Sequence, residues 1–164
     1  MPEEDFRIQE MQLEDLESVL RIEASSFTEP WSREMFQEEL APDISLVLVA
    51  RTEEATILGY LCGSIAEGAF HISNVAVDLG VRRLGVGREL VRSALAQACR
   101  RGAVTATLEV RASNLTAQAL YRDFGFIVVG RRRRYYTKPV EDGLIMCLDR
   151  LDETINAWSE GEKA

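Results

Sequence analysis

The sequence contains few of the residues from which disulfide frameworks and metal sites are built. In 164 residues it has one histidine, His71, and three cysteines, Cys62, Cys99 and Cys147. The cysteines are odd in number and scattered, without Cys-x-x-Cys spacing, so we expect reduced, packed side chains, no disulfide and no metal site. For His71, a surface or packing position on a strand is favoured over a catalytic role.

The sequence also lacks long apolar runs and an excess of basic residues. No stretch approaches the roughly 20 apolar residues of a membrane span, and the start, Met-Pro-Glu-Glu-Asp, lacks the basic and apolar segments of a signal peptide. Asp and Glu number 27 against 19 Lys and Arg, for a net charge of -8. This balance argues against nucleic-acid binding and is compatible with a cationic peptide partner. We therefore expect a cytoplasmic protein that binds neither a membrane nor nucleic acid directly.

What is present is an ordinary globular composition, 46% hydrophobic and 28% charged, with apolar periodicity that alternates between strand and helix. It predicts strands over residues 6–10, 45–51, 57–66, 70–77, 107–111, 127–136 and 144–148. It predicts helices over residues 13–26, 33–40, 85–101 and 114–124. The first helix should bury a stripe of five apolar residues: Leu13, Leu16, Val19, Leu20 and Phe27. We expect one α/β or α+β domain over residues 1–150, with helices covering a sheet, and an acidic, partly ordered helical tail over residues 151–164.

A turn between an apolar strand and a helix has the features of a phosphate site. Gly85 and Gly87 at the helix start let the backbone approach a ligand, and the first helical N–H groups have no internal partner. These donors and the positive end of the helix dipole favour an anion. Arg82, Arg83 and Arg88 lie within the same few residues, and a cation in a first helical turn opposes the dipole unless an anion is bound there.

The class of phosphate ligand follows from the spacing. A dinucleotide fingerprint would need a third glycine where Leu90 stands, and the Gly-Lys-Ser/Thr of a Walker loop is absent. The pattern Arg82-x-x-Gly85-x-Gly87 after a Val-Ala-Val strand instead resembles the acetyl-CoA signature of the GNAT acetyltransferases. Taken alone, the turn is equally compatible with a plain tight turn that opens a helix.

A second stretch makes the resemblance more specific. Residues 108–126, Leu-Glu-Val-Arg-Ala-Ser-Asn-Leu-Thr-Ala-Gln-Ala-Leu-Tyr-Arg-Asp-Phe-Gly-Phe, resemble the strand–helix unit of the RimI group, the ribosomal-protein-alanine N-acetyltransferases of the GNAT superfamily. Three shorter matches agree: Pro-Trp-Ser at 30–32, Arg-Arg-Arg-Tyr-Tyr at 132–136, which resembles the Arg-x-Tyr-Tyr of the family's late substrate loop, and Glu-Asp-Gly-Leu-Ile-Met at 141–146. Gly143 stands where the family usually has Ala. The resemblance covers residues 6–148.

The resemblance implies a fold, a cofactor and its contacts. The fold is the GNAT fold, with a mixed, mostly antiparallel sheet of about seven strands flanked by helices, and the co-substrate is acetyl-CoA. The backbone of Val75, Ala76 and Val77 would hold the acetyl-pantetheine arm and meet the oxyanion where the family splays two strands apart. The pyrophosphate would be bound by the six residues of the turn, with Arg82 aiding electrostatically: Arg83, Leu84, Gly85, Val86, Gly87 and Arg88.

The resemblance also assigns the chemistry. Glu109, flanked by apolar residues on its strand, would be the general base, acting directly or through water, and Tyr121 the proton donor to the departing thiolate. Glu109 could instead pair with Arg111 or another cation, and Tyr121 could be a core residue. Asn114 could cap its helix, contact CoA, or do both. The aromatic residues expected to line a peptide groove, although packing is an alternative for each, are Trp31, Tyr135 and Tyr136.

The implied reaction is direct acetyl transfer to the N-terminal alanine of a small-subunit ribosomal protein. An α-amino group, with a pKa of ~7.7–8, needs less help to lose its proton than lysine, at ~10.4. Two alternatives stay open: an acetyltransferase for a lysine or a small-molecule amine, and a non-catalytic CoA-binding module.

The arginines at 131–134 do not suggest RNA binding, because alternation along a strand would divide them between two faces.

Overall fold

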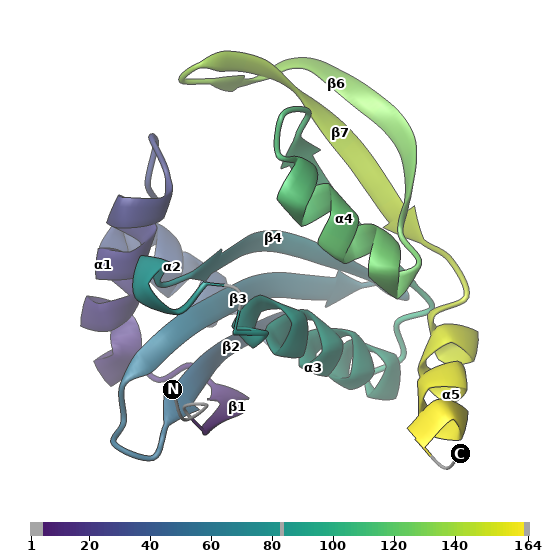
Figure 1. Ribbon diagram of the computed structural model, residues 1–164, viewed down its shortest axis with the longest axis horizontal. Coiled ribbons are helices and arrows are strands. Elements are labelled where there is room, and N and C mark those ends of the chain that lie inside the picture. Colours follow the sequence, from purple (N-terminus) through teal and green to yellow (C-terminus); the bar gives the residue numbers. More distant parts are fainter. Residues whose placement is uncertain (1–4, 83, 163–164) are drawn as a thin grey trace. The chain divides into compact units, whose positions relative to one another are not determined.

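The computed structural model describes residues 5–82 and 84–162, and this part of the chain contains seven strands and five α-helices (Figure 1). It divides into two compact units. Unit 1 holds the chain up to Ser64 together with Ser73–Ala94, and unit 2 holds Ile65–Ile72 and the chain from Leu95 onward. Among the helices of the described residues, none is long and apolar enough to cross a membrane.

The strands form a mixed sheet in the order β1-β2-β3-β4-β5-β7-β6. Of the pairings described, β4 with β5 is parallel and the others are antiparallel. The seven-stranded, mostly antiparallel sheet is therefore confirmed. The bounds are β1 (Phe6–Glu10), β2 (Ser45–Thr52), β3 (Ile57–Ala66), β4 (Ala69–Val77), β5 (Thr105–Arg111), β6 (Ile127–Thr137) and β7 (Val140–Leu148). Strands β5 and β7 begin two and four residues earlier than the sequence pattern predicted.

The N-terminal helical segment departs from the predicted stripe. It begins with a 3-10 turn, η1 (Leu13–Asp15), and continues as α1 (Leu16–Ser26). Leu13 is 68% exposed and Phe27 is 39% exposed, so both predictions of burial are wrong. Leu13 lies in the 3-10 turn and Phe27 is the extended residue after the helix, and neither position continues the α-helical face. Ile22 and Glu23 occupy that face instead.

In unit 1, helix packs against strand with the two backbones close together at Gly59. Helix α2 (Arg33–Leu40) begins at the predicted N-cap, where the Ser32 hydroxyl accepts from Met35 N–H at 3.2 Å. A short 3-10 turn, η2 (Leu79–Val81), follows β4 and precedes α3 (Val86–Arg100). A Cβ at Gly59 would lie 2.8 Å from the Ala76 carbonyl oxygen and 3.3 Å from Leu90. Gly59 thus allows α3 to lie close against β3 and β4.

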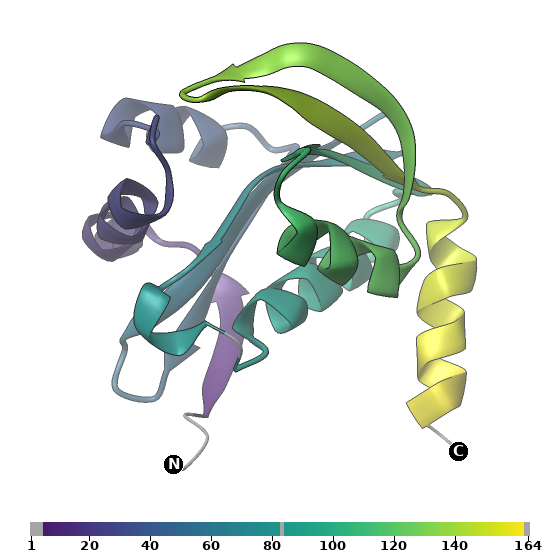
Figure 2. The ribbon, with the colours of Figure 1, turned by 45° about the horizontal axis from the view of Figure 1, so that its top comes forward.

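Unit 2 contains α4 (Leu115–Phe124) and α5 (Leu151–Glu162). Helix α4 ends at Gly125, whose φ of +105° is the left-handed cap expected there. Residues 151–162 form a helix that is anchored at both ends. The Leu151 amide donates to the Val104 carbonyl at 3.0 Å, and the ring of Trp158 lies 5.4 Å from that of Phe124. Both ribbon views place α5 beside the C-terminal end of α4 (Figures 1 and 2).

Candidate active site

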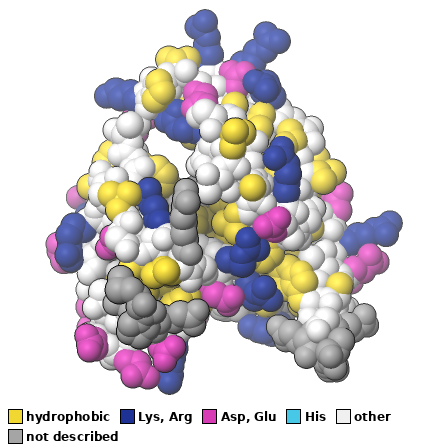
Figure 3. Space-filling view, viewed as in Figure 1, with side chains coloured by type: hydrophobic (Ala, Val, Ile, Leu, Met, Phe, Trp, Pro, Cys, Tyr) yellow, Lys and Arg dark blue, Asp and Glu magenta, His cyan; other side chains and the backbone are white. Residues whose placement is uncertain are grey.

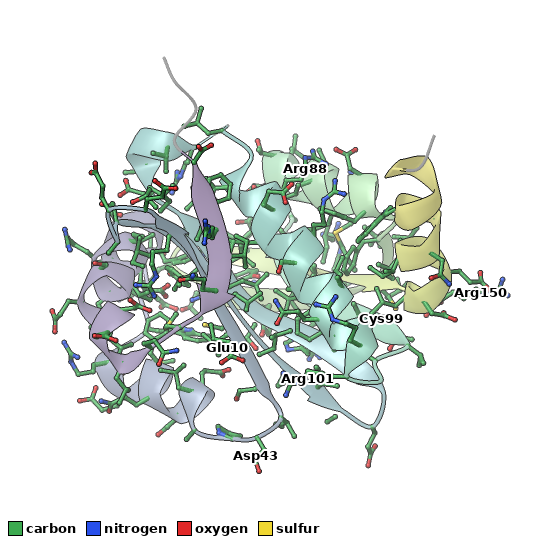
Figure 4. All side chains as sticks on the ribbon, turned by 90° about the horizontal axis from the view of Figure 1, so that it is seen from below. Glu10, Asp43, Arg88, Cys99, Arg101 and Arg150 are labelled. Atoms are coloured by element: carbon green, nitrogen blue, oxygen red, sulfur yellow. The ribbon has the colours of Figure 1, made fainter. Side chains whose placement is uncertain are left out.

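The predicted phosphate-binding turn has the backbone geometry of an anion site. Gly85 has a φ of +84°, a left-handed conformation that a residue with a side chain adopts only with strain. Val86 follows, nearly fully buried, as the first residue of α3. The Glu89 amide donates to the Gly85 carbonyl at 3.0 Å, so Gly85 accepts the first hydrogen bond of the helix. Figure 4 shows Arg88 at this end of α3.

Arg82 is positioned beside the turn by two neutral acceptors. Its Nε donates to the Val77 carbonyl at 3.1 Å, and its Nη2 donates to the Ser26 hydroxyl at 3.3 Å. The side chain thus joins the end of β4 to the end of α1, and neither contact neutralises its charge. Leu84 is 58% exposed. Arg83 lies outside the described residues.

The predicted acetyl-arm segment forms the last three residues of β4. Ala76 is buried, and its carbonyl faces Gly59. Val75 and Val77 are half-buried. Beyond the strand, the Asp78 amide donates to the Leu58 carbonyl at 2.8 Å. The backbone that the resemblance assigns to acetyl-pantetheine is therefore fixed from its β3 side.

In unit 2, Glu109 is held between two basic side chains. Strands β4 and β5 pair in parallel from Ala69↔Thr105 to Ile72↔Leu108, and Glu109 is the next residue of β5. Its Oε2 lies 2.7 Å from His71 Nε2, and its Oε1 lies 3.6 Å from Arg132 Nε. The Glu109 side chain is 15% exposed and that of His71 is 43% exposed. The carboxylate is sheltered and oriented, yet one of its neighbours is open to solvent.

His71 is the member of this cluster that sequence reasoning undervalued. It pairs in register with Thr107, which lies two residues before Glu109 and therefore on the same face of β5. The alternation of side chains along β5 indicates that Thr107 and Glu109 share a face, but this places His71 beside Glu109 only once β4 is known to pair with β5. Of the alternative in which Glu109 pairs with Arg111 or another cation, the Arg111 pair is not observed, because that guanidinium is engaged elsewhere, whereas a pair with another cation, Arg132, is observed.

Arg111 instead fastens the end of the β6–β7 hairpin. Its Nη1 lies 3.2 Å from Glu141 Oε1 and 3.1 Å from the Pro139 carbonyl, and its guanidinium lies 4.3 Å over the Tyr136 ring. The other carboxylate oxygen of Glu141 accepts from the Ser113 amide at 2.6 Å. The hydrogen bonds from Ser113, with the charge of Arg111 adding, lower the pKa of Glu141. Tyr136 is thereby held in place by an ion pair that is only partly exposed.

The arginine run does not follow the regular alternation that the sequence analysis assumed. The β6–β7 register shifts between Arg132 and Tyr136, and Arg134 has a φ of +51°. Asp142 accepts from both the Arg131 side chain at 2.7 Å and the Arg134 amide at 3.0 Å, whereas Arg132 turns to Glu109. The regular strand alternation assumed for this run is therefore interrupted after Arg132, while the side chains of Arg131 and Arg132 contact different partners. Figure 3 shows basic side chains over this hairpin.

Gly143, the departure from the family pattern, lies under Tyr135. A Cβ at Gly143 would lie 3.1 Å from a ring carbon of Tyr135. That distance is shorter than most real Cβ contacts, so the glycine gives the tyrosine ring room against β7. The Tyr135 ring also lies edge-on to Tyr136, with centroids 5.0 Å apart.

Helix α4 carries the remaining predicted residues. The Asn114 side-chain oxygen accepts from the Ala117 amide at 3.1 Å, which confirms its role as a cap. Buried Gln118 donates to the carbonyls of Arg111 and Ala112 and ties the helix to the end of β5. Tyr121 is 8% exposed, and burial raises its pKa to about 12, so the phenol keeps its proton at neutral pH. Its ring lies 5.7 Å from that of Phe126, so the packing alternative is observed as well.

The structure thus groups the predicted residues by unit. Unit 1 holds Trp31 and the predicted phosphate-binding turn. Unit 2 holds the predicted base Glu109, the predicted acid Tyr121 and both tyrosines of the β6–β7 hairpin. Within unit 2, Glu109 and Tyr136 are close enough for the charge of Glu109 to help raise the pKa of Tyr136, for which burial is the larger cause.

Comparisons with known proteins identify the family of the chain. The profile described as the Acetyltransferase (GNAT) family matches residues 16–126. The chain is 39% identical over 140 residues to a putative ribosomal protein bS18-alanine N-acetyltransferase of Bacillus subtilis, covering 85% of this chain and 92% of that protein. It is 33% identical over 146 residues to the ribosomal protein bS18-alanine N-acetyltransferase of Escherichia coli K12, covering 86% and 95%. The crystal structure of the Escherichia coli ribosomal-protein-S18-alanine N-acetyltransferase matches with a TM-score of 0.82 at 30% identity, over 89% of this chain and 94% of that one.

Proposed function

The chain belongs to the GNAT acetyltransferase family, and we propose that it transfers acetyl from acetyl-CoA to the N-terminal alanine of a small-subunit ribosomal protein. The substrate assignment is supported by relatives of similar length that carry this activity in their names. The observation that carries the chemistry is the sheltered Glu109 carboxylate, contacted by His71 and Arg132.

The cofactor contacts follow from unit 1. The positive N-terminal end of α3 and the charges of Arg82 and Arg88 suit the pyrophosphate of acetyl-CoA. The last residues of β4, Val75 to Val77, would hold the pantetheine arm through their backbone. Asn114, whose side-chain oxygen caps α4, has an amide that suits a contact to CoA.

The reaction needs one proton acceptor and one proton donor. Acetyl-CoA supplies the acetyl group as a thioester. Glu109 takes the proton released as the amine nitrogen bonds to the acetyl carbon, and Tyr121 gives its phenolic proton to the thiolate sulfur as the carbon–sulfur bond breaks. His71, whose Nε2 lies 2.7 Å from Glu109 Oε2, orients the carboxylate.

The proton demand fits an α-amino substrate. An α-amino group has a pKa of ~7.7–8 and is partly neutral near physiological pH, so a carboxylate base suffices to take its proton. A lysine amine has a pKa of ~10.4 and would need a far stronger base to lose its proton. Trp31, Tyr135 and Tyr136 supply apolar surface on which the first residues of a peptide could lie.

A peptide panel analysed by mass spectrometry tests this proposal. It contains peptides with a free N-terminal Ala, Ser, Met or Gly and one N-blocked peptide with an internal lysine. We expect a single added acetyl group on the Ala peptide and none on the blocked peptide. Acetylation of the lysine alone would assign the protein to another acetyltransferase branch, and tight acetyl-CoA binding without any product would indicate a binding module.

A further inference from the structure

Unit 1 contains a buried carboxylate that the proposed chemistry does not use. Glu23, on α1, is 1% exposed. Its Oε1 accepts from the Trp31 amide at 2.9 Å, and its Oε2 accepts from Asn74 Nδ2 at 2.8 Å and from the Tyr60 hydroxyl. All three donors are uncharged. They come from three separate segments: the stretch before α2, strand β4 and strand β3.

The donor set is matched to a carboxylate and not to an amide. An ionised Glu only accepts hydrogen bonds, whereas a Gln would present an NH₂ group to one side of the site. On the Oε2 side that group would face two other donors, Tyr60 and Asn74. Burial, together with the hydrogen bond to Glu23 and its charge, raises the pKa of Tyr60 far above the usual value, so the phenol is a committed donor. Burying a carboxylate is costly unless several strong hydrogen bonds compensate for lost water.

The groups joined by Glu23 flank the expected substrate contacts of unit 1. The ring of Trp31 lies 5.2 Å from Phe36, and Phe36 lies edge-on to Tyr60 at 5.6 Å. Trp31 packs on the core cluster that contains Phe36 and Tyr60. On the other side, Asn74 directly precedes Val75, where the acetyl-arm segment begins.

We propose that Glu23 is a positioning residue for the peptide substrate. It fixes residues 27–32, and with them the Trp31 ring, relative to Asn74 and the acetyl-arm segment of β4. This inference rests on the proposed function, because it assigns Trp31 to the seating of a peptide N-terminus. Glu23 is buried and would not touch the peptide; it would affect peptide binding only through the position of Trp31.

Steady-state kinetics of three single variants test the inference. Glu23→Gln keeps the size of the side chain but turns an NH₂ toward Tyr60 and Asn74. Because at least one hydrogen bond to a charged group is lost, we expect the KM for the Ala peptide to rise about 10-fold, with kcat and the KM for acetyl-CoA changed much less. Tyr60→Phe removes one donor and should raise the peptide KM by a smaller factor. Glu38→Gln, an exposed site on α2, is the matched control and should behave as wild type.

The double variant Glu23→Gln/Asn74→Asp exchanges the donor and the acceptor across the site. A carboxylate at position 74 can accept from the new amide and from Tyr60, so we expect the peptide KM to return toward the wild-type value. Asn74→Asp alone sets two carboxylates against each other and should impair peptide binding. An equal KM in the double variant and in Glu23→Gln, or an unchanged peptide KM in the folded Glu23→Gln and Tyr60→Phe proteins, would overturn the inference.

A second measurement does not depend on turnover. The sequence has two tryptophans, Trp31 and Trp158, so a Trp158→Phe background reports on Trp31 alone. We expect acrylamide to quench Trp31 more strongly after Glu23→Gln than after Glu38→Gln. Unchanged quenching would refute the link between Glu23 and Trp31 even if the wild-type protein is active. Altered quenching in a protein that acetylates no peptide would instead leave the link standing and refute the proposed function.

Discussion

Glu23 and Glu109 are both sheltered carboxylates, but the two units surround them with different groups. Glu23 is almost fully buried and accepts from three neutral donors. Glu109 keeps 15% of its side chain exposed and contacts one histidine and one arginine. A carboxylate with fixed neutral donors has nowhere to pass a proton, whereas one beside an exposed imidazole and open to solvent can exchange it. The first environment suits positioning and the second suits proton transfer.

The largest expected effect separates these two roles directly. Glu109→Gln removes the proton acceptor while keeping the side-chain shape, and we expect kcat to fall by ~10²–10⁴. The peptide KM should stay close to the wild-type value, which is the reverse of the pattern expected for Glu23→Gln. Initial rates over a range of peptide concentrations measure both constants, with Glu54→Gln in the exposed β2–β3 turn as the control. Wild-type kcat in Glu109→Gln would remove the basis for contrasting the two carboxylates.

The next effect concerns the proton donor of unit 2. Tyr121→Phe leaves the packing with Phe126 but removes the phenolic proton, and we expect kcat to fall by about 10². Because burial raises the pKa of Tyr121 to about 12, the phenol stays protonated until the pH approaches that value. The wild-type kcat should therefore show no loss of a required acid as the pH rises to about 10. A pH profile of kcat checks this, and a decline with a midpoint near pH 8 in wild type that persists in Tyr121→Phe would assign the acid to another group.

The sequence predicted the elements better than it predicted the partners of individual side chains. Periodicity located all seven strands, and glycine and capping residues located the starts and ends of α3 and α4, because these signals are local. The pairing of His71 with Glu109 was missed because it depends on β4 lying beside β5, and the two residues are 38 positions apart in the chain. No local pattern contains that adjacency.

Glu23 was missed for a different reason. A charged residue is normally assigned to the outer face of an amphipathic helix, so the apolar stripe was drawn through Leu13 and Phe27 instead. In α1, Glu23 lies seven residues after Leu16 and four after Val19, and therefore on the same buried face as these two residues. A polar residue on the inner face can be recognised only when its donors are known, and these come from β3, β4 and the segment before α2.

The smallest expected effect extends the comparison of the units to the peptide-binding aromatics. Unit 1 places Trp31 through a buried carboxylate, whereas unit 2 places Tyr135 through the absence of a side chain at Gly143. In Gly143→Ala the new Cβ would lie 3.1 Å from the Tyr135 ring, and the ring must shift by a few tenths of an ångström. Because the tyrosine is 47% exposed and can yield, we expect a rise in peptide KM well below 10-fold, with kcat unchanged. If Gly143→Ala raised the peptide KM more than Glu23→Gln does, then Tyr135, and not the positioning of Trp31 by Glu23, would set peptide affinity.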